Sequence, residues 1–123
     1  MFKAEILKEV FEHASDELTQ IYKQYGPCEV KRRDIPEEIN EDEVEFRNEG
    51  VKNDIGDIYV GEFRKGSNIR EGRGLLLSHE NYVYEGFWAN DHKSGFGRII
   101  LATGSIYQGN WRKDKSEGKG IFV

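Results

Sequence analysis

The second half of this chain repeats itself three times, and a repeat limits the fold strongly because each copy must form the same structural unit. The copies span residues 56–74, 81–97 and 104–120. Each copy reads Tyr-x-Gly-x-aromatic, then a polar stretch, then Gly-x-Gly. The repeated framework consists of Tyr59, Gly61, Phe63, Gly72, Gly74, Tyr84, Gly86, Trp88, Gly95, Gly97, Tyr107, Gly109, Trp111, Gly118 and Gly120.

The third copy shows most clearly what each unit forms. Its first segment, residues 106–111, alternates with period two, which is typical of a strand. Tyr107, Gly109 and Trp111 fall on one face, and the residues between them are polar and indicate a wetter face. A polar turn and the segment 118–122 follow, so each copy is predicted to be a β-hairpin.

The links between hairpins are predicted to be tight turns as well. The aligned positions are Gly56, Asn81 and Gly104. Gly and Asn tolerate positive φ most readily, which such turns require. Within the hairpins, a ring on one strand can cover a glycine on its neighbour, which stabilises a sheet. The Gly-x-Gly pairs lack the third glycine of a dinucleotide loop and no helix pattern follows them, so nucleotide binding is not expected.

Residues 2–25 read as one amphipathic helix that ends at Gly26-Pro27. Its apolar residues at helical spacing include Phe2, Ile6, Val10 and Leu18. A helix this apolar on one side needs a partner surface. That surface is either the rest of its own chain or another protein, and the sequence leaves both open.

Residues 28–48 are strongly charged and read as a solvated connector. The basic triplet 31–33 is too short to indicate nucleic-acid binding. Residues 44–46 alternate and predict a first short strand. The expected organisation is therefore a helix over residues 1–26, a connector over 27–49 and repeats over 50–123.

Composition narrows the function further. Cys28 is the only cysteine, which excludes an internal disulfide or a Cys-x-x-Cys site. His13, His79 and His92 lie in different segments, and no nucleophile and base are paired, so we expect neither a metal, a cofactor nor catalysis. The first ten residues lack the apolar core of a secretory signal, and no apolar run approaches a membrane span, which predicts a soluble cytoplasmic protein.

The pattern Tyr-x-Gly-x-Trp, polar loop, Gly-x-Gly, at a spacing of about 23 residues, resembles the MORN repeat. The resemblance covers residues 50–123. Three departures concern the loops and the first copy: Phe63 replaces Trp, two residues are inserted before Gly72, and Asp91 and Asp114 stand where the family has a loop glycine. The resemblance implies a mainly β fold, a single-layer elongated antiparallel sheet of MORN-type β-hairpins with an N-terminal α-helix.

The same resemblance implies a structural or adaptor protein that binds other proteins, of the kind frequent in cilia, flagella and the cytoskeleton. We expect the final strand, 120–123, to be an open edge that invites strand addition. The predicted partner contacts are Phe2, Ile6, Val10, Leu18, Ile121 and Phe122.

The alternative is a module that binds acidic phospholipids. Residues 1–58 hold 8 Lys/Arg and 16 Asp/Glu, net −8, whereas residues 59–123 hold 10 and 7, net +3. The repeat region therefore carries the basic loop residues Arg64, Lys65, Arg112, Lys113 and Lys115. Each charge of this kind contributes roughly 1 kcal/mol near an anionic membrane surface. The acidic half of the chain largely cancels this charge, which favours the protein-binding hypothesis.

Overall fold

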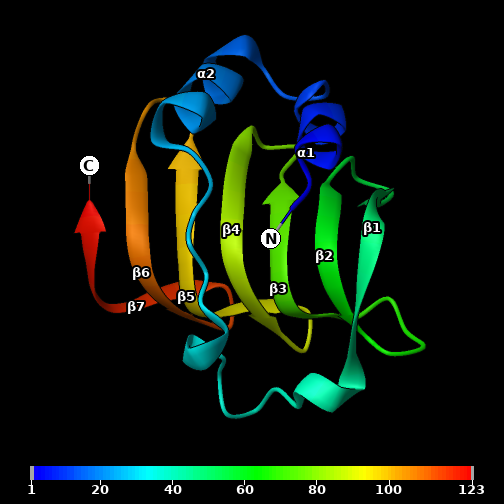
Figure 1. The fold of residues 1–123 in the computed structure, drawn as a ribbon. Helices are drawn as coiled ribbons and strands as arrows, with labels where there is room; N and C mark the ends of the chain where they lie inside the picture. Colours follow the sequence, from blue (N-terminus) through cyan, green and yellow to red (C-terminus); the bar gives the residue numbers. More distant parts are fainter. Residues whose placement is uncertain (1, 123) are drawn as a thin grey trace.

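The computed structural model describes residues 2–122, in which a seven-stranded antiparallel sheet carries two helices over one of its faces (Figure 1). The strands are β1 (Val44–Lys52), β2 (Ile58–Arg64), β3 (Arg70–Leu77), β4 (Tyr82–Ala89), β5 (His92–Leu101), β6 (Ile106–Arg112) and β7 (Lys115–Phe122). Their order in the sheet follows the chain, so every connection joins neighbouring strands. The mainly β, open antiparallel sheet predicted from the repeats is confirmed.

Each repeat forms one hairpin, namely β2–β3, β4–β5 and β6–β7. The turns between hairpins contain Gly56, Asn81 and Gly104 at φ values of 97°, 66° and 97°, as their residue types predict. The turns Asn90-Asp91 and Lys113-Asp114 have φ between 47° and 71° at all four residues. Positive φ at both central residues is the geometry of a type I′ turn, which matches the twist of the strands it joins.

The two faces of the sheet bury different side chains because successive residues of a strand point to opposite sides. We call the face beneath the helices the helix face; its apolar residues are Ile58, Val60, Leu75, Leu77, Val83, Ile100 and Ile106. We call the opposite face the aromatic face; its cluster contains Tyr59, Phe63, Leu76, Tyr84, Trp88, Tyr107 and Trp111. The repeat pattern thus specifies the aromatic face, and the residues between the framework positions build the helix face.

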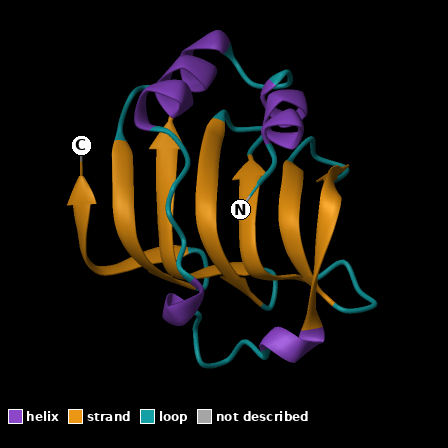
Figure 2. Cartoon of the chain, viewed as in Figure 1, coloured by secondary structure: helices purple, strands orange, loops and turns teal. Residues whose placement is uncertain are grey.

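Two helices replace the single helix that the periodicity predicted (Figure 2). They are α1 (Ala4–Phe11) and α2 (Asp16–Tyr25). The chain breaks at Ser15, which has extended backbone and whose hydroxyl accepts a hydrogen bond from the Leu18 amide. Serine favours this capping role over a place inside a helix. The break lets both short helices lay their apolar sides on the curved sheet.

The charge of residues 28–48 predicted a solvated linker, but the connector packs against the sheet. It runs across the helix face beside α2 and then turns below the sheet, with short 3-10 helices at Arg32–Asp34 and Glu41–Glu43 (Figure 1). Cys28 and Ile39 are buried, and Ile39 packs with Ala89 of the sheet. The apolar residues spaced between the charges are therefore anchors, and the charges face outward.

Strand β1 lies before the repeats and extends the sheet beyond them. The short strand predicted at residues 44–46 exists, and it continues to Lys52 with a bulge after Arg47. It pairs with β2 of the first repeat. The sheet therefore starts inside the region expected to be connector.

Candidate interaction surfaces

The rings of the aromatic face form one continuous ladder. Tyr84 meets Trp88 and Trp111 edge to face, with ring centroids 5.2 and 5.4 Å apart and interplanar angles of 86° and 85°. Tyr59 meets Trp88 in the same way, and Tyr107 meets Trp111. Aromatic pairs at such distances and angles contribute about 0.5–1.5 kcal/mol each beyond their buried area. Each tyrosine of the second and third copies thus contacts its own tryptophan, and the tryptophans bridge successive repeats.

Each framework tyrosine also covers the last glycine of its own repeat. A Cβ placed on Gly97 would lie 2.3 Å from the Tyr84 hydroxyl oxygen, and one on Gly74 would lie 2.1 Å from that of Tyr59. These glycines face others directly across the sheet, with Gly74 paired to Gly86 and Gly97 to Gly109. The glycines therefore form a row without side chains, and the tyrosine rings fill the space above it.

Hydrogen bonds fix the rings to the backbone. The indole N–H of Trp88 donates to the Gly74 carbonyl, and that of Trp111 donates to the Gly97 carbonyl, each at 3.2 Å. The Tyr84 hydroxyl donates to the Phe87 carbonyl at 2.8 Å, and burial raises the pKa of this tyrosine. Each indole bond runs to the preceding repeat, so it couples neighbouring hairpins.

Asp91 and Asp114, in the turns at the end of the sheet away from the helices, also connect neighbouring hairpins. The Asp91 carboxylate accepts from the backbone N–H of Arg70 at 3.2 Å, and Asp114 accepts from that of Lys93 at 2.8 Å. In the opposite direction, the Asp91 amide donates to the Arg70 carbonyl. Aspartate at the position of the family's loop glycine therefore ties one turn to the strand of the repeat before it.

Comparison with known families gives the same assignment. The MORN repeat family matches residues 84–106 and 107–123. The chain contains MORN repeats. A search of curated proteins returned no match. The MORN family is generally non-enzymatic, and its repeats occur in scaffold proteins and in membrane-associated or lipid-binding proteins.

The first copy of the repeat, residues 56–74, lies outside the residues that the MORN family matches but forms the same kind of hairpin. Its Tyr59 hydroxyl donates to the Glu62 carbonyl at 2.7 Å, three residues on, as in the second copy. Phe63 takes the place of tryptophan and meets Tyr59 edge to face at 5.0 Å. The Arg47 guanidinium lies 4.0 Å above the Phe63 ring and covers it. The two extra residues lengthen only the loop between β2 and β3.

A buried polar network joins the helical layer to the MORN sheet. The Glu85 carboxylate is 2% exposed in β4 and accepts hydrogen bonds from the Tyr22 hydroxyl at 2.9 Å and the Cys28 amide at 3.0 Å. Arg98 of β5 lies 3.8 Å from Glu85 and donates to the Gly26 carbonyl. Burial raises the pKa of Glu85, and it raises the pKa of the Cys28 thiol to about 11. Strand alternation alone did not reveal this network, because it indicated a solvated side for these positions.

The apolar side chains of the N-terminal segment pack on their own chain. Ile6, Val10 and Leu18 are buried in the cluster that includes the helix-face side chains. Phe2 packs against the same cluster and contacts the Phe46 ring at 6.2 Å between centroids. The four N-terminal residues predicted to touch a partner therefore contact the sheet of their own chain.

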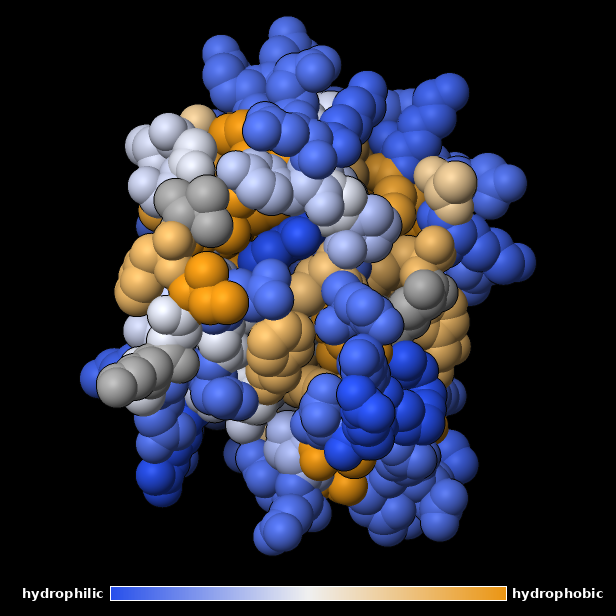
Figure 3. All heavy atoms as spheres, turned by 60° about the vertical axis from the view of Figure 1, so that its left-hand side comes forward, coloured by the Kyte–Doolittle hydropathy of each residue, from blue (hydrophilic) through white to orange (hydrophobic). Residues whose placement is uncertain are grey.

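The two C-terminal residues predicted to touch a partner are open. Strand β7 pairs only with β6 among the described strands. Ile121 is 65% exposed and Phe122 is 76% exposed. The Phe122 ring lies 4.8 Å from that of Tyr107, the last tyrosine of the ladder. Apolar side chains interrupt the hydrophilic surface on the side of the molecule nearest β7 (Figure 3).

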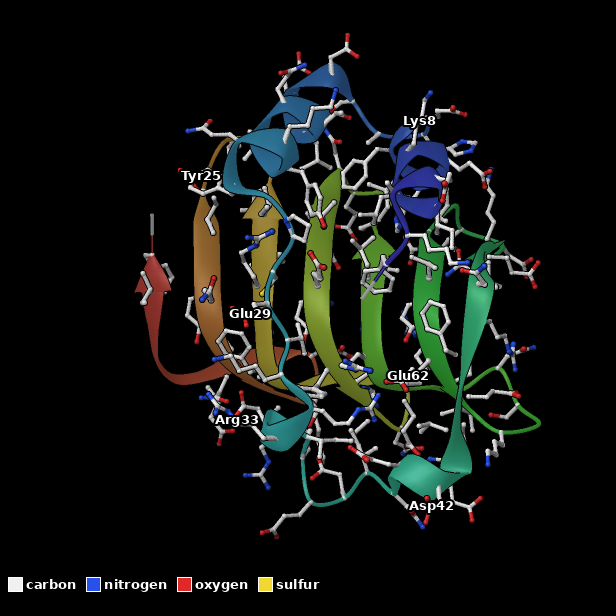
Figure 4. The ribbon with its side chains drawn as sticks, viewed as in Figure 1. Lys8, Tyr25, Glu29, Arg33, Asp42 and Glu62 are labelled. Atoms are coloured by element: carbon white, nitrogen blue, oxygen red, sulfur yellow. The ribbon has the colours of Figure 1, made fainter. Side chains whose placement is uncertain are left out.

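The basic loop residues do not form an unopposed positive patch. Arg64 pairs with Glu71 at 2.9 Å, and Arg112 lies 3.7 Å from Glu117. The Lys65 amide donates to the Glu43 carbonyl, which brings the acidic end of the connector beside the first basic loop. Figure 4 shows Asp42 of this acidic turn below the strands. The positive potential of the repeats is thus reduced locally.

Two histidines lie against aspartates at turns of the sheet. His79 Nδ1 is 2.7 Å from Asp57 Oδ1, and His92 Nδ1 is 2.6 Å from Asp114 Oδ2. Burial would raise the pKa of both aspartates, but hydrogen bonds from the neighbouring histidines and backbone amides outweigh it and lower them. Within residues 2–122, no group of three or more His, Cys, Asp or Glu could hold a metal ion. No helix of these residues has the length and apolar character of a membrane span.

Proposed function

We propose that the protein is a non-enzymatic structural or adaptor subunit that docks into a larger protein assembly through its MORN sheet. The observation that carries the proposal is the open edge of β7, with Ile121 and Phe122 mostly exposed. An exposed apolar edge strand offers unpaired backbone groups and invites strand addition from another chain. The N-terminal helices, which pack in cis, serve first to cover the helix face.

The competing function is a membrane-tethering module that binds acidic phospholipids. Lys113 and Lys115 are exposed and make none of the ion pairs among the described side chains. The pairing of Arg64 and Arg112 with glutamates weighs against membrane binding, because a paired cation attracts an anionic headgroup less strongly. The protein-binding function is therefore favoured.

We further propose that the assembly is cytoplasmic and associated with the cytoskeleton, with the axoneme of the cilium or flagellum as its first candidate location. The proposal rests on where MORN-repeat proteins of the structural class are frequent. The partners would be other protein subunits, neither a nucleic acid nor a membrane-spanning segment being implied.

The test uses the tagged full chain, purified from cells under native conditions and analysed by cross-linking mass spectrometry. We expect cross-links from Lys115 to a reproducible partner subunit, and we expect Phe122→Asp to abolish them. Ile55→Asp is the matched control, because Ile55 is 63% exposed in the turn between β1 and β2. Equal recovery of the partner with both variants, or a monomer without partners, would refute docking at this edge.

Liposome sedimentation separates the competing function. If the chain sediments with vesicles containing phosphatidylserine, and Lys113→Glu with Lys115→Glu releases it while Phe122→Asp does not, the module tethers membranes. No sedimentation with either neutral or acidic vesicles supports the protein-binding function.

A further inference from the structure

An open groove lies between the two N-terminal helices, apart from the β7 edge. Its volume is about 560 Å³, within the range of ligand sites. The residues that line it are Ala4, Leu7, Lys8, Phe11, Glu12, Thr19, Tyr22, Lys23, Gly26 and Pro27. Figure 3 shows apolar surface among the hydrophilic side chains of the helical layer.

Both helices present the same spacing to the groove. From α1 come Ala4, Leu7, Lys8 and Phe11, which follow one another at intervals i, i+3, i+4 and i+7. The same intervals recur in α2 and its C-cap, at Thr19, Tyr22, Lys23 and Gly26. Such residues share one side of a helix. The groove borders the helix-face cluster: Tyr22 is buried in that cluster, and Leu7 and Phe11 pack against it from the groove side.

The floor of the groove is apolar and only partly covered. The Phe11 and Tyr22 rings are 4.5 Å apart between centroids and join the two helices. Leu7 and Phe11 are half-buried rather than buried. Leu7 and Pro27 also line a second hollow of about 340 Å³, which continues toward Glu85 and Arg73 of the sheet. The groove thus has an apolar centre that remains accessible.

Two cations stand at the rim. Lys8 and Lys23 are exposed and occupy equivalent positions among the groove-lining residues of α1 and α2. Neither makes any of the ion pairs found among the described residues. Figure 4 shows Lys8 on α1, above the sheet. Glu12 is the one acidic residue of the lining. An apolar centre with two unpaired ammonium groups at its rim is complementary to an apolar ligand that carries carboxylates.

We propose that this groove binds a short amphipathic helix of a partner protein, with its apolar side against Leu7 and Phe11 and its Asp or Glu residues against Lys8 and Lys23. The helices α1 and α2, of 8 and 10 residues, are about 12 and 15 Å long at about 1.5 Å per residue. The groove therefore accommodates roughly two to three turns of a helix, which is read through anchors at i, i+3 or i+4 and i+7.

A peptide helix fits this site better than a fatty acyl chain does. An acyl chain gains most where protein surrounds it, since ligand sites usually bury most of their ligand. This groove is open to solvent along the helices and has one cation on each wall. A helix with apolar residues on one side and acidic residues flanking them meets both walls at once.

The probe is a phage-displayed library of 14-residue peptides with a helix-favouring framework, selected on the full chain. We expect enriched peptides to carry apolar residues at i, i+3 or i+4 and i+7 with flanking Asp or Glu. Synthetic copies are then measured by fluorescence anisotropy. The double variant Lys8→Glu/Lys23→Glu should weaken binding at least about tenfold, and peptides with Lys in place of the acidic residues should recover it.

The control is Lys65→Glu/Lys115→Glu, which reverses two exposed lysines that do not line the groove and should leave the affinity unchanged. The proposal is overturned if no peptide binds below roughly 1 mM, the weak end of measurable affinity. It is also overturned if the two double variants behave alike, or if dodecanoate binds at Lys8 and Lys23 while the peptides do not.

The inference extends the proposed adaptor function with a second surface, and the experiments keep the two apart. Phe122→Asp should leave peptide binding intact, because β7 does not line the groove. A partner that still depends on Phe122 when no peptide binds would preserve the adaptor function and remove the groove proposal alone.

Discussion

Replacing Gly97 by alanine tests whether the tyrosine rings require the glycine row. The new Cβ would lie 2.3 Å from the Tyr84 hydroxyl oxygen and 2.5 Å from Cζ, distances that no side chain sustains. The Gly97 backbone is outside the positive-φ region, so steric conflict with the ring is the main cost. The ring must therefore move away from the strand.

The magnitude follows from what Tyr84 loses when it moves. Its hydrogen bond to the Phe87 carbonyl contributes about 1 kcal/mol. Its edge-to-face contacts with Trp88 and Trp111 contribute about 1 kcal/mol each. Alanine recovers about 0.5–1 kcal/mol because it is less flexible than glycine in the unfolded chain. We expect Gly97→Ala to lower the free energy of unfolding by about 2–2.5 kcal/mol, or the melting temperature by about 8–10 °C.

The assay is a double-mutant cycle with Tyr84→Ala, followed by urea unfolding. If the ring causes the cost, Gly97→Ala should be neutral or slightly stabilising once the ring is absent, with a coupling of about 2–3 kcal/mol. If Tyr84→Ala does not fold, the same double-mutant cycle can be measured on Tyr107 and Gly120. Equal effects of Gly97→Ala with and without the ring would refute the reasoning. Gly50→Ala is the control, because its Cβ would come no closer than 3.2 Å to another residue.

Two further predictions concern contacts that repeat along the sheet. Trp88→Phe removes the indole bond to Gly74 and part of the buried ring, and should cost at least about 1 kcal/mol in urea unfolding; an unchanged midpoint would contradict it. The pKa values of Asp57 and Asp114 are lowered in the fold, so both contribute stability above their unfolded pKa of about 3.9 that is lost as the pH falls through their folded pKa. Asp57→Asn and Asp114→Asn should therefore lose stability at pH 7 but not at pH 2, as followed by thermal melts; equal losses at both would contradict the linkage.

The hairpins and their turns could be predicted because local signals repeat in register. Tyr84 and Gly97 recur as Tyr107 and Gly120, so three copies reinforce one interpretation. Asn81 indicates a turn by its residue type alone. These features depend on residues that are close in the sequence or on the adjacent strand. The alternating pattern of each copy indicates both.

The helix face could not be predicted in the same way. The third copy has Gln108 and Asn110 between its framework residues, which correctly indicates a wetter side there, since Asn110 is exposed. The second copy places Glu85 and Phe87 at the equivalent positions, and both are buried. Glu85 accepts hydrogen bonds from Tyr22 and Cys28, which lie 63 and 57 positions earlier in the chain. Contacts at that separation leave no periodic trace. Ser15 did carry a capping signal, but the apolar spacing continued across it.

The glycine row also has a mechanical meaning. Because Gly74, Gly86, Gly97 and Gly109 pair in sequence across the sheet, they mark a crease along which the strands can bend with no side chain in the way. Figure 1 shows the strands curving strongly toward the end away from the helices. The tyrosine rings fill the space above this row, so we expect the size of the ring to limit how far the strands can bend there. A smaller ring at Tyr59 or Tyr84 is therefore expected to change the shape of the sheet at a distance from the exposed edge of β7.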